Sequence, residues 1–240
     1  NGALRVVLTL DPYFRAYATE HYRNGAKVVA LPDPVHPAVN VTAEESRVVN
    51  RVPAGRIMLL LFGHLTERKG VLVLLEALRM LPSGIANRVA VVFAGKVEPT
   101  IHDDFDEGCR RLEREQPDIW LQVEDRRVSA GELDALMRRC DVVLAPYQRF
   151  VGSSGVLLWA ARAGKPVLTQ NFGLLGRAVG DHQLGLAVDC SDARSVADGI
   201  RHMIVNGVDG FINRPAAQAF VADRTPRRFA AMVFESLLQD

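Results

Sequence analysis

The feature that most constrains the fold is an alternation of short apolar runs with longer amphipathic segments along almost the whole chain. The apolar runs are rich in Val, Leu and Ala, and several show no in–out alternation of polar residues. Such runs are typical of strands covered on both faces, as in parallel sheets. They predict eight strands, at Arg5–Leu10, Lys27–Leu31, Arg56–Phe62, Arg88–Ala94, Ile119–Val123, Asp141–Ala145, Pro166–Gln170 and Leu184–Val188.

The amphipathic segments between these runs predict helices. Thr42 and Glu45 have the spacing of a capping box at one helix start. The segment Lys69–Leu81 is rich in leucine and is ended by Pro82 and Gly84. The repeated β-α-β order indicates the α/β class, with a doubly wound parallel sheet and right-handed crossovers. The remaining predicted helices are Pro99–Gln116, Ser129–Cys140, Ser153–Ala163, Gly173–Val179, Asp192–Val205, Arg214–Ala222 and Thr225–Leu238.

A proline-rich stretch marks one boundary in the chain. Pro32, Pro34 and Pro37 lie close together, which makes this segment a stiff, extended connector. Only two short strands and one helix are expected before it, too little to fold alone. We therefore expect residues 1–38 to be the tail of an N-terminal domain with its connector. Residues 39–240 are expected to form a complete α/β domain with two C-terminal helices.

Charge and cysteine content limit the possible functions. The formal net charge is +1 over 240 residues, so no global electrostatic field favours nucleic acid as a partner.

The three cysteines, Cys109, Cys140 and Cys190, are too few and too scattered for a disulfide framework or a zinc site. We expect free thiols in a reducing compartment, the cytoplasm. Apolar runs such as Ile57–Phe62 are far shorter than the roughly 20 residues of a transmembrane helix, so no membrane span is expected.

Two loops at predicted strand ends have chemistry suited to phosphate, and the first is Gly63–Gly70. In a parallel α/β sheet, ligands bind where the carboxyl ends of strands lead into helices. Gly63 permits a sharp turn at the strand end, and His64 and Lys69 follow it. A cation at the start of a helix is unfavourable unless an anion is also present. A solvated loop with Lys69 in water is the alternative, and this loop alone leaves both open.

The second loop, Val151–Gly155, precedes an apolar helix. Ser153 or Ser154 is a suitable N-cap for that helix. Gly152 and Gly155 let backbone N–H groups converge on an anion such as a diphosphate. A capped helix start without a ligand is the competing interpretation, because serine and glycine are common at such positions.

Motifs of several other protein classes are absent. No G-x-G-x-x-G sequence follows a predicted strand, which argues against a dinucleotide-dependent oxidoreductase. The segment Gly164–Pro166 lacks the other residues of a Walker loop, and no serine lies in a G-x-S-x-G elbow. The acidic segment that begins at His102 is explained as a solvated helix start. We therefore predict neither a metal site nor a cofactor.

Four segments, taken in order, resemble the C-terminal domain of the group 1, retaining glycosyltransferases of the glycosyltransferase-B fold. They are LLLFGHLTERKGVLVLLEAL (59–78), VAVVFAGKVEP (89–99), VSAGELDALMRRCDVVLAPY (128–147) and GVLLWAARAGKPVLTQNFGLLGRAVGDHQLGLAV (155–188). The similarity extends over about residues 32–205. In that family the C-terminal domain holds the nucleoside diphosphate of an activated sugar, and the N-terminal domain holds the acceptor.

The resemblance implies a glycosyltransferase with a nucleotide-sugar donor and a glycan, lipid or small-molecule acceptor. Lys69 and the basic position at His64, where the family usually has arginine, would contact the diphosphate. The implied donor-binding set is Gly63, His64, Lys69, Gly152, Ser153, Ser154 and Gly155. Two alternatives remain: a sugar-nucleotide epimerase of the same fold, and a non-catalytic sugar-nucleotide-binding or carbohydrate-binding scaffold.

The chain departs from the family at its paired glutamates, which have seven residues between them. Aligned on Gly164–Val167, these positions are Val151 and Trp159, and no Glu or Asp occurs between Tyr147 and Lys165. Neither residue can accept the hydrogen bonds of sugar and ribose hydroxyls. No catalytic residue is therefore assigned. Catalysis would depend on positioning and on stabilising the leaving diphosphate, and we expect the 240 residues to bind donor without transferring sugar.

Overall fold

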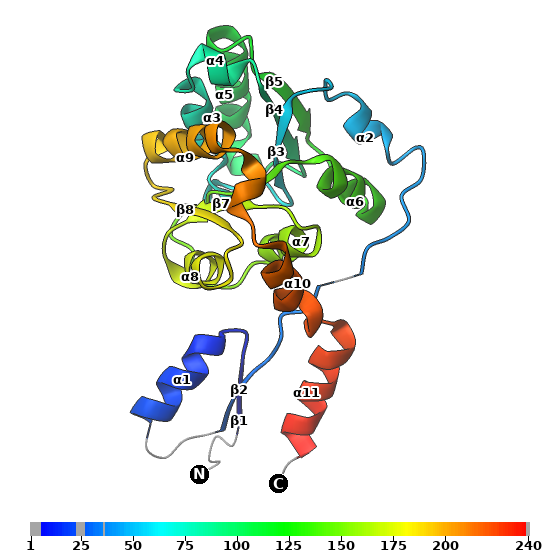
Figure 1. The fold of residues 1–240 in the computed structure, drawn as a ribbon, viewed down its shortest axis with the longest axis vertical. Coiled ribbons are helices and arrows are strands. Elements are labelled where there is room, and N and C mark those ends of the chain that lie inside the picture. The colour runs from blue at the N-terminus through cyan, green and yellow to red at the C-terminus, as the bar shows by residue number, and fades with distance from the viewer. Residues whose placement is uncertain (1–5, 23–26, 36, 239–240) are drawn as a thin grey trace.

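The computed structural model describes residues 6–22, 27–35 and 37–238, which form a larger and a smaller unit joined by an extended segment (Figure 1). The larger unit has a six-stranded parallel sheet in the order β5-β4-β3-β6-β7-β8, and the smaller one pairs β1 with β2 in parallel. All eight predicted strands are present; Arg5, included in the first prediction, lies outside the described residues. The strands are β1 (Val6–Thr9), β2 (Lys27–Ala30), β3 (Ile57–Phe62), β4 (Val89–Ala94), β5 (Trp120–Glu124), β6 (Val142–Ala145), β7 (Val167–Gln170) and β8 (Gly185–Val188).

Helices cover both faces of the six-stranded sheet, which confirms the doubly wound α/β fold. Along β3, Leu59 and Leu61 belong to one core and Leu60 to the other, and all three are at most 1% exposed. The continuous apolar run of this strand therefore reflects burial on both faces. One face carries α3 (Val71–Arg79), α5 (His102–Glu115) and α9 (Ala193–Asn206), and the other carries α2 (Arg47–Asn50), α6 (Ala130–Arg139), α7 (Gly155–Arg162), α8 (Gly173–His182) and α10 (Arg214–Ala222).

Several helix boundaries differ from the sequence predictions, among them the start of α2 and the segment after Pro82. Thr42 and Glu45 do exchange the hydrogen bonds of a capping box, but these bonds close a turn, and α2 begins later, at Arg47. Pro82 ends the preceding helical segment as predicted, yet it also begins a further short helix, α4 (Ser83–Ala86). Proline is well suited to a helix start because its φ is already near the helical value.

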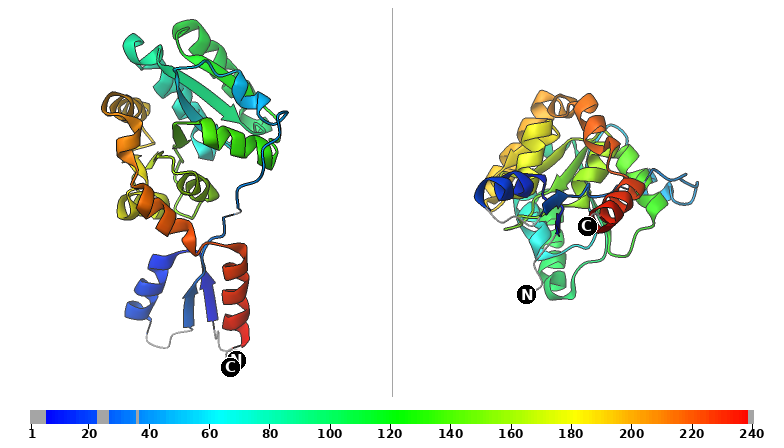
Figure 2. Two further views of the ribbon diagram at one scale, coloured as in Figure 1. Left: turned by 45° about the vertical axis from the view of Figure 1, so that its right-hand side comes forward. Right: turned by 90° about the horizontal axis from the view of Figure 1, so that it is seen from below.

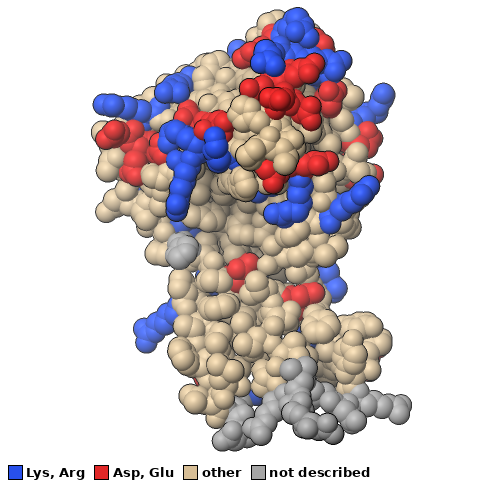
Figure 3. Space-filling model, turned by 180° about the vertical axis from the view of Figure 1, so that it is seen from behind, with Lys and Arg blue, Asp and Glu red and all other residues tan. Residues whose placement is uncertain are grey.

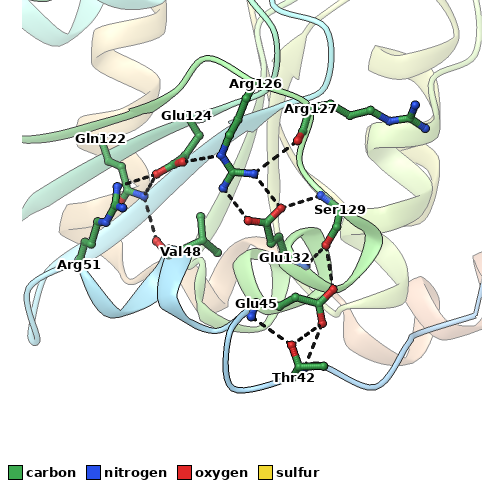
Figure 4. Close-up of polar contacts among 10 residues, drawn as sticks. All are labelled: Thr42, Glu45, Val48, Arg51, Gln122, Glu124, Arg126, Arg127, Ser129 and Glu132. Carbon is green, nitrogen blue, oxygen red and sulfur yellow. Dashed lines mark hydrogen bonds and ion pairs between the residues drawn. The ribbon is translucent and has the colours of Figure 1, made fainter.

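A polar network ties α2 and α6 to the edge strand β5 (Figure 4). Glu124, 7% exposed, accepts hydrogen bonds from Arg51 at 3.0 Å and from Arg126 at 3.1 Å. Arg126 also pairs with Glu132 at 2.5 Å, and Glu132 forms a capping box with Ser129 at the start of α6. Charged groups along an edge strand disfavour pairing with a further strand.

The smaller unit is made from both ends of the described chain. Its helices α1 (Pro12–His21) and α11 (Pro226–Leu238) lie on either side of β1 and β2 (Figure 2). The N–H of Val35, which lies in the connector, donates to the carbonyl of Arg224, just before α11, at 2.8 Å.

The face shown in Figure 3 carries many interspersed Lys, Arg, Asp and Glu side chains on the larger unit and few on the smaller one.

Candidate functional site

The carboxyl ends of β3 and β6 lie side by side at the point where the chain order reverses. From β3 the chain continues to β4 and β5 on one side, and from β6 to β7 and β8 on the other. The crevice at such a switch point is where open α/β sheets bind ligands. The two loops predicted from the sequence, Gly63–Gly70 and Val151–Gly155, follow these two strands, so the fold brings them to one place.

The segments that follow β3 and β6 are in direct contact. The N–H of Gln148 donates to the carbonyl of Arg68 at 2.8 Å. Gly70 has a φ of 72°, and a Cβ at this position would lie 1.9 Å from the carbonyl oxygen of Pro146, so only glycine fits. This left-handed residue separates the 3-10 turn η1 (Glu67–Lys69) from α3, which therefore begins two residues later than predicted.

Lys69 folds back over the end of β3 instead of extending into solvent. Its Nζ donates to the carbonyl oxygen of Phe62 at 2.5 Å and lies 5.8 Å from the centre of the Phe62 ring. Burial, with a smaller contribution from the positive charge of Arg68, lowers the pKa of Lys69 to about 8. No carboxylate among the described residues pairs with this ammonium group. An anion placed beside it would favour its charged form and raise its pKa again.

Gly63 makes room for this ammonium group. It has a φ of 92°, and a Cβ here would lie 2.5 Å from the Nζ of Lys69. Gly95, which follows β4, packs so closely on the carbonyl oxygen of Gly63 that a Cβ would lie 1.9 Å from it. The side chain of His64 is exposed and forms no hydrogen bond with the part of the chain that the structure describes.

Of the two serines in the second loop, Ser154 is the N-cap of α7. Its Oγ accepts from the N–H of Val156 at 3.3 Å and lies 2.8 Å from the hydroxyl of Tyr147. Gly155 is exposed at the first position of the helix, and a Cβ there would meet nothing within 4 Å. Ser153 is half-buried beside the cap. The helix N-terminus is thus open, with its first backbone N–H groups available to an anion.

Three residues that the sequence interpretation did not include complete this region. The guanidinium carbon of Arg68 lies 4.6 Å from the centre of the Phe150 ring. Gln170, fully buried at the end of β7, donates to the carbonyls of Phe150 and Phe172, while its Oε1 has no partner. Each had a signal in the sequence: Arg68 is a second cation next to Lys69, Phe150 is an aromatic residue just before the glycine loop, and Gln170 is a polar residue at the end of an apolar strand.

The positions of the family's glutamates have two different environments. Val151 is 69% exposed on the second loop. Trp159 is half-buried on α7, with its ring 6.4 Å from that of Phe62 in an edge-to-face arrangement and the guanidinium of Arg162 over it at 4.3 Å. The Trp159 position is therefore part of the packing beneath the site and offers no hydrogen-bond acceptor there.

A largely apolar crevice connects the second loop with the smaller unit. Ser153 and Ser154 lie at its border, leucines of α7 and α8 line its wall, and Leu10 and Tyr13 face them from the smaller unit. The two units thus meet beside the candidate site.

Residues 6–22, 27–35 and 37–238 contain no group of three or more His, Cys, Asp or Glu side chains able to hold a metal ion. Within the same ranges no helix combines the length and apolar character of a membrane span. Cys109, Cys140 and Cys190 are buried free thiols, as predicted.

Comparison with known proteins gives one matching family description. Residues 42–219 match the family described as "Glycosyl transferases group 1". The chain is 30% identical over 248 residues to a D-inositol 3-phosphate glycosyltransferase from Arthrobacter sp. (strain FB24), an alignment that covers 98% of this chain and 56% of the relative. The chain therefore spans little more than half the length of this curated relative.

Solved structures share the arrangement at low sequence identity. Sucrose-phosphate synthase from Thermosynechococcus elongatus has a TM-score of 0.74 at 18% identity, covering 98% of this chain and 59% of the synthase. HepE from Anabaena, crystallised in complex with UDP and glucose, has a TM-score of 0.70 at 16% identity, covering 97% of this chain and 63% of HepE. At these identities the structures show a common fold.

Proposed function

This chain belongs to the group 1 glycosyl transferases, and on that premise we propose that it binds the nucleoside diphosphate of an activated sugar between the ends of β3 and β6. The observation that carries the proposal is the half-buried ammonium group of Lys69, which has a pKa of about 8 and no carboxylate partner among the described residues. A diphosphate would supply the opposite charge that this group lacks. Family membership favours glycosyl transfer over the epimerase alternative.

The other predicted donor-binding residues have roles in the proposed site that complement that of Lys69. Gly63 leaves space for the ammonium group of Lys69. His64 is exposed and occupies the position where the group 1 glycosyl transferases usually have arginine. The segment Gly152–Gly155 presents backbone N–H groups at the N-terminus of α7, where the helix dipole favours an anion. UDP is the first donor nucleotide to test because the structurally similar HepE was crystallised with it.

The proposed reaction is a retaining glycosyl transfer: the bond between the sugar C1 and the diphosphate breaks, a bond from C1 to an acceptor oxygen forms on the same face of the sugar, and the nucleoside diphosphate leaves. Negative charge accumulates on the leaving phosphate as the bond between C1 and the diphosphate lengthens. Lys69 and the N–H groups of α7 stabilise that charge without having to reorganise. Because Val151 and Trp159 offer no carboxylate, the chain contributes positioning and charge stabilisation to the reaction.

We propose that the smaller unit belongs to the acceptor-side domain, with residues 1–38 as the tail and connector of that domain. Residues 39–240 form the donor-binding domain except for α11, which packs on the smaller unit. A two-stranded sheet is too small to be stable alone, and the chain spans 56% of the curated relative. The acceptor, a glycan, a lipid or a small molecule, would bind on that side of the crevice. The three buried free thiols support a location in the reducing cytoplasm.

Calorimetric titration of the 240-residue protein with UDP, GDP, ADP and dTDP tests the proposal. We expect one nucleoside diphosphate to bind, and the matching nucleoside monophosphate to bind at least about tenfold more weakly because it lacks the second phosphate. We expect no sugar transfer by these residues alone. Absence of binding by all four diphosphates at millimolar concentration would contradict the site, and turnover would contradict the assignment of the acceptor domain.

A further inference from the structure

Arg68 lies between the two loops of the site, on a support of aromatic rings. Its guanidinium carbon is 4.6 Å from the centre of the Phe150 ring and 5.5 Å from that of Tyr147. These two rings pack against each other with their centres 5.0 Å apart. A guanidinium group over aromatic faces is attracted by their quadrupoles and keeps its N–H groups free for other partners.

The aromatic support is itself held in place from three directions. Gln170, the last residue of β7, donates to the carbonyl of Phe150. The N–H of Leu174 donates to the carbonyl of Val151 at 3.2 Å. The hydroxyl of Tyr147 is hydrogen-bonded to Ser154, the N-cap of α7. The position of the Arg68 guanidinium is therefore coupled to the N-terminus of α7.

The charge of Arg68 is not compensated by any group in residues 6–22, 27–35 and 37–238. Its guanidinium forms neither an ion pair nor a hydrogen bond there, although a guanidinium carries five N–H donors. Elsewhere in the molecule Arg79, Arg126 and Arg214 each bind a carboxylate. Arg68 packs on aromatic rings beside the half-buried Lys69, and no carboxylate of the described residues pairs with either, so positive charge is concentrated at the switch point.

We propose that Arg68 is a second diphosphate-binding residue, which supplies the permanent charge absent from His64 and makes the site select diphosphates over monophosphates. This inference rests on the proposed function. A guanidinium can bind two phosphate oxygens at once in a planar fork, which lysine cannot do. Arg68 comes from the loop after β3, whereas the aromatic rings that set the direction of its fork and the N–H groups of α7 both come from the segment after β6.

The test compares Arg68→Ala, Arg68→Gln and Arg68→Lys with an Arg114→Ala control. Arg114 is exposed in the last turn of α5, which begins after the carboxyl end of β4 and runs back toward the amino ends of the strands. Its removal changes the net charge equally but far from the site. Each variant is titrated with the preferred nucleoside diphosphate and with its monophosphate, at two salt concentrations, and its melting temperature is recorded.

We expect Arg68→Ala and Arg68→Gln to weaken diphosphate binding at least tenfold and monophosphate binding less than threefold, with a smaller salt dependence than the wild type. Arg68→Lys should recover only part of the affinity, and Arg114→Ala none of the loss. Equal losses for both nucleotides would reduce Arg68 to a loop-positioning residue and overturn the inference. Unchanged affinity in both neutral variants would also overturn it. If the wild type binds no diphosphate, the proposed function fails first.

Discussion

The hydroxyl of Tyr13 donates a hydrogen bond of 2.7 Å to Oδ2 of Asp181, and this bond links the smaller unit to α8 of the larger one. Arg177, also on α8, places its guanidinium carbon 3.5 Å from the centre of the Tyr13 ring and its Nε 3.6 Å from Asp181. Three side chains thus hold α1 against α8 at the margin of the crevice. The relative position of the two units depends on a small polar contact in addition to apolar packing.

Tyr13→Phe should loosen this contact without changing the ring. Loss of one partly exposed hydrogen bond is expected to lower the free energy of unfolding by about 1 kcal/mol. Burial and then the hydrogen bond to Asp181 raise the pKa of Tyr13 to about 12. The stabilisation is therefore complete below about pH 10 and lost as the pH rises from about 10 to 12. Urea unfolding of both proteins across this range measures the difference, and identical pH profiles would contradict it.

Lys69 should make diphosphate binding depend on pH. Its ammonium group loses its proton near pH 8 in the free protein, so affinity should fall as the pH rises above that value. Lys69→Ala should weaken binding at pH 7 by roughly 1.5–3 kcal/mol. Lys69→Arg keeps the charge and serves as the control, because titration of the nucleotide itself affects both proteins equally. Calorimetry between pH 6.5 and pH 9.5 gives the comparison.

The free protein should show the opposite trend in stability. A lysine in the unfolded chain keeps its proton until a pH of about 10.4, whereas Lys69 in the folded chain releases it near pH 8. The unfolded state therefore binds more protons between these values, and stability rises with pH across this window. Lys69→Met should remove that rise, and a rise of equal size in the variant would assign it to other groups.

The second loop allows cap and ligand effects to be separated. Ser154→Ala removes the N-cap of α7 and should lower stability by about 0.5–2 kcal/mol, while Ser153→Ala should change it by less than about 0.5 kcal/mol. A Cβ at Gly155 would meet nothing within 4 Å, so Gly155→Val should leave folding nearly unchanged yet obstruct a phosphate at the helix N-terminus. Melting temperature and nucleotide affinity are measured for all three. Full affinity in Gly155→Val would place the phosphates elsewhere.

Asp134 joins the segment after the connector to α6 and α7. The carboxylate is 2% exposed; one oxygen accepts from the N–H of Val39 at 2.5 Å and the other pairs with Arg162. Asp134→Ala removes the anionic partner from a buried pair and should lower stability by about 3–5 kcal/mol. Asp198→Ala, which breaks an exposed pair with Arg201, should change it by less than about 1 kcal/mol. Urea unfolding distinguishes the two, and similar small effects would contradict the assigned role.

The amino-acid sequence by itself determined the strands, most helices and the two loops. Runs such as Ile57–Phe62 require burial on both faces, and Ser154 caps a helix through one bond from the N–H of Val156, only two positions away, so these features are encoded locally. Resemblance in order and spacing then identified the family. Contacts between distant segments left no comparable local pattern.

Only the tertiary structure decided how the loops combine. The order of strands places β6 beside β3, and this adjacency puts Arg68 on Phe150. The return of α11 to the smaller unit has the same origin, since nothing within Pro226–Leu238 specifies which sheet it meets. Periodicity encodes which side of an element is buried, whereas the partner that buries it is selected by the packing of the whole chain.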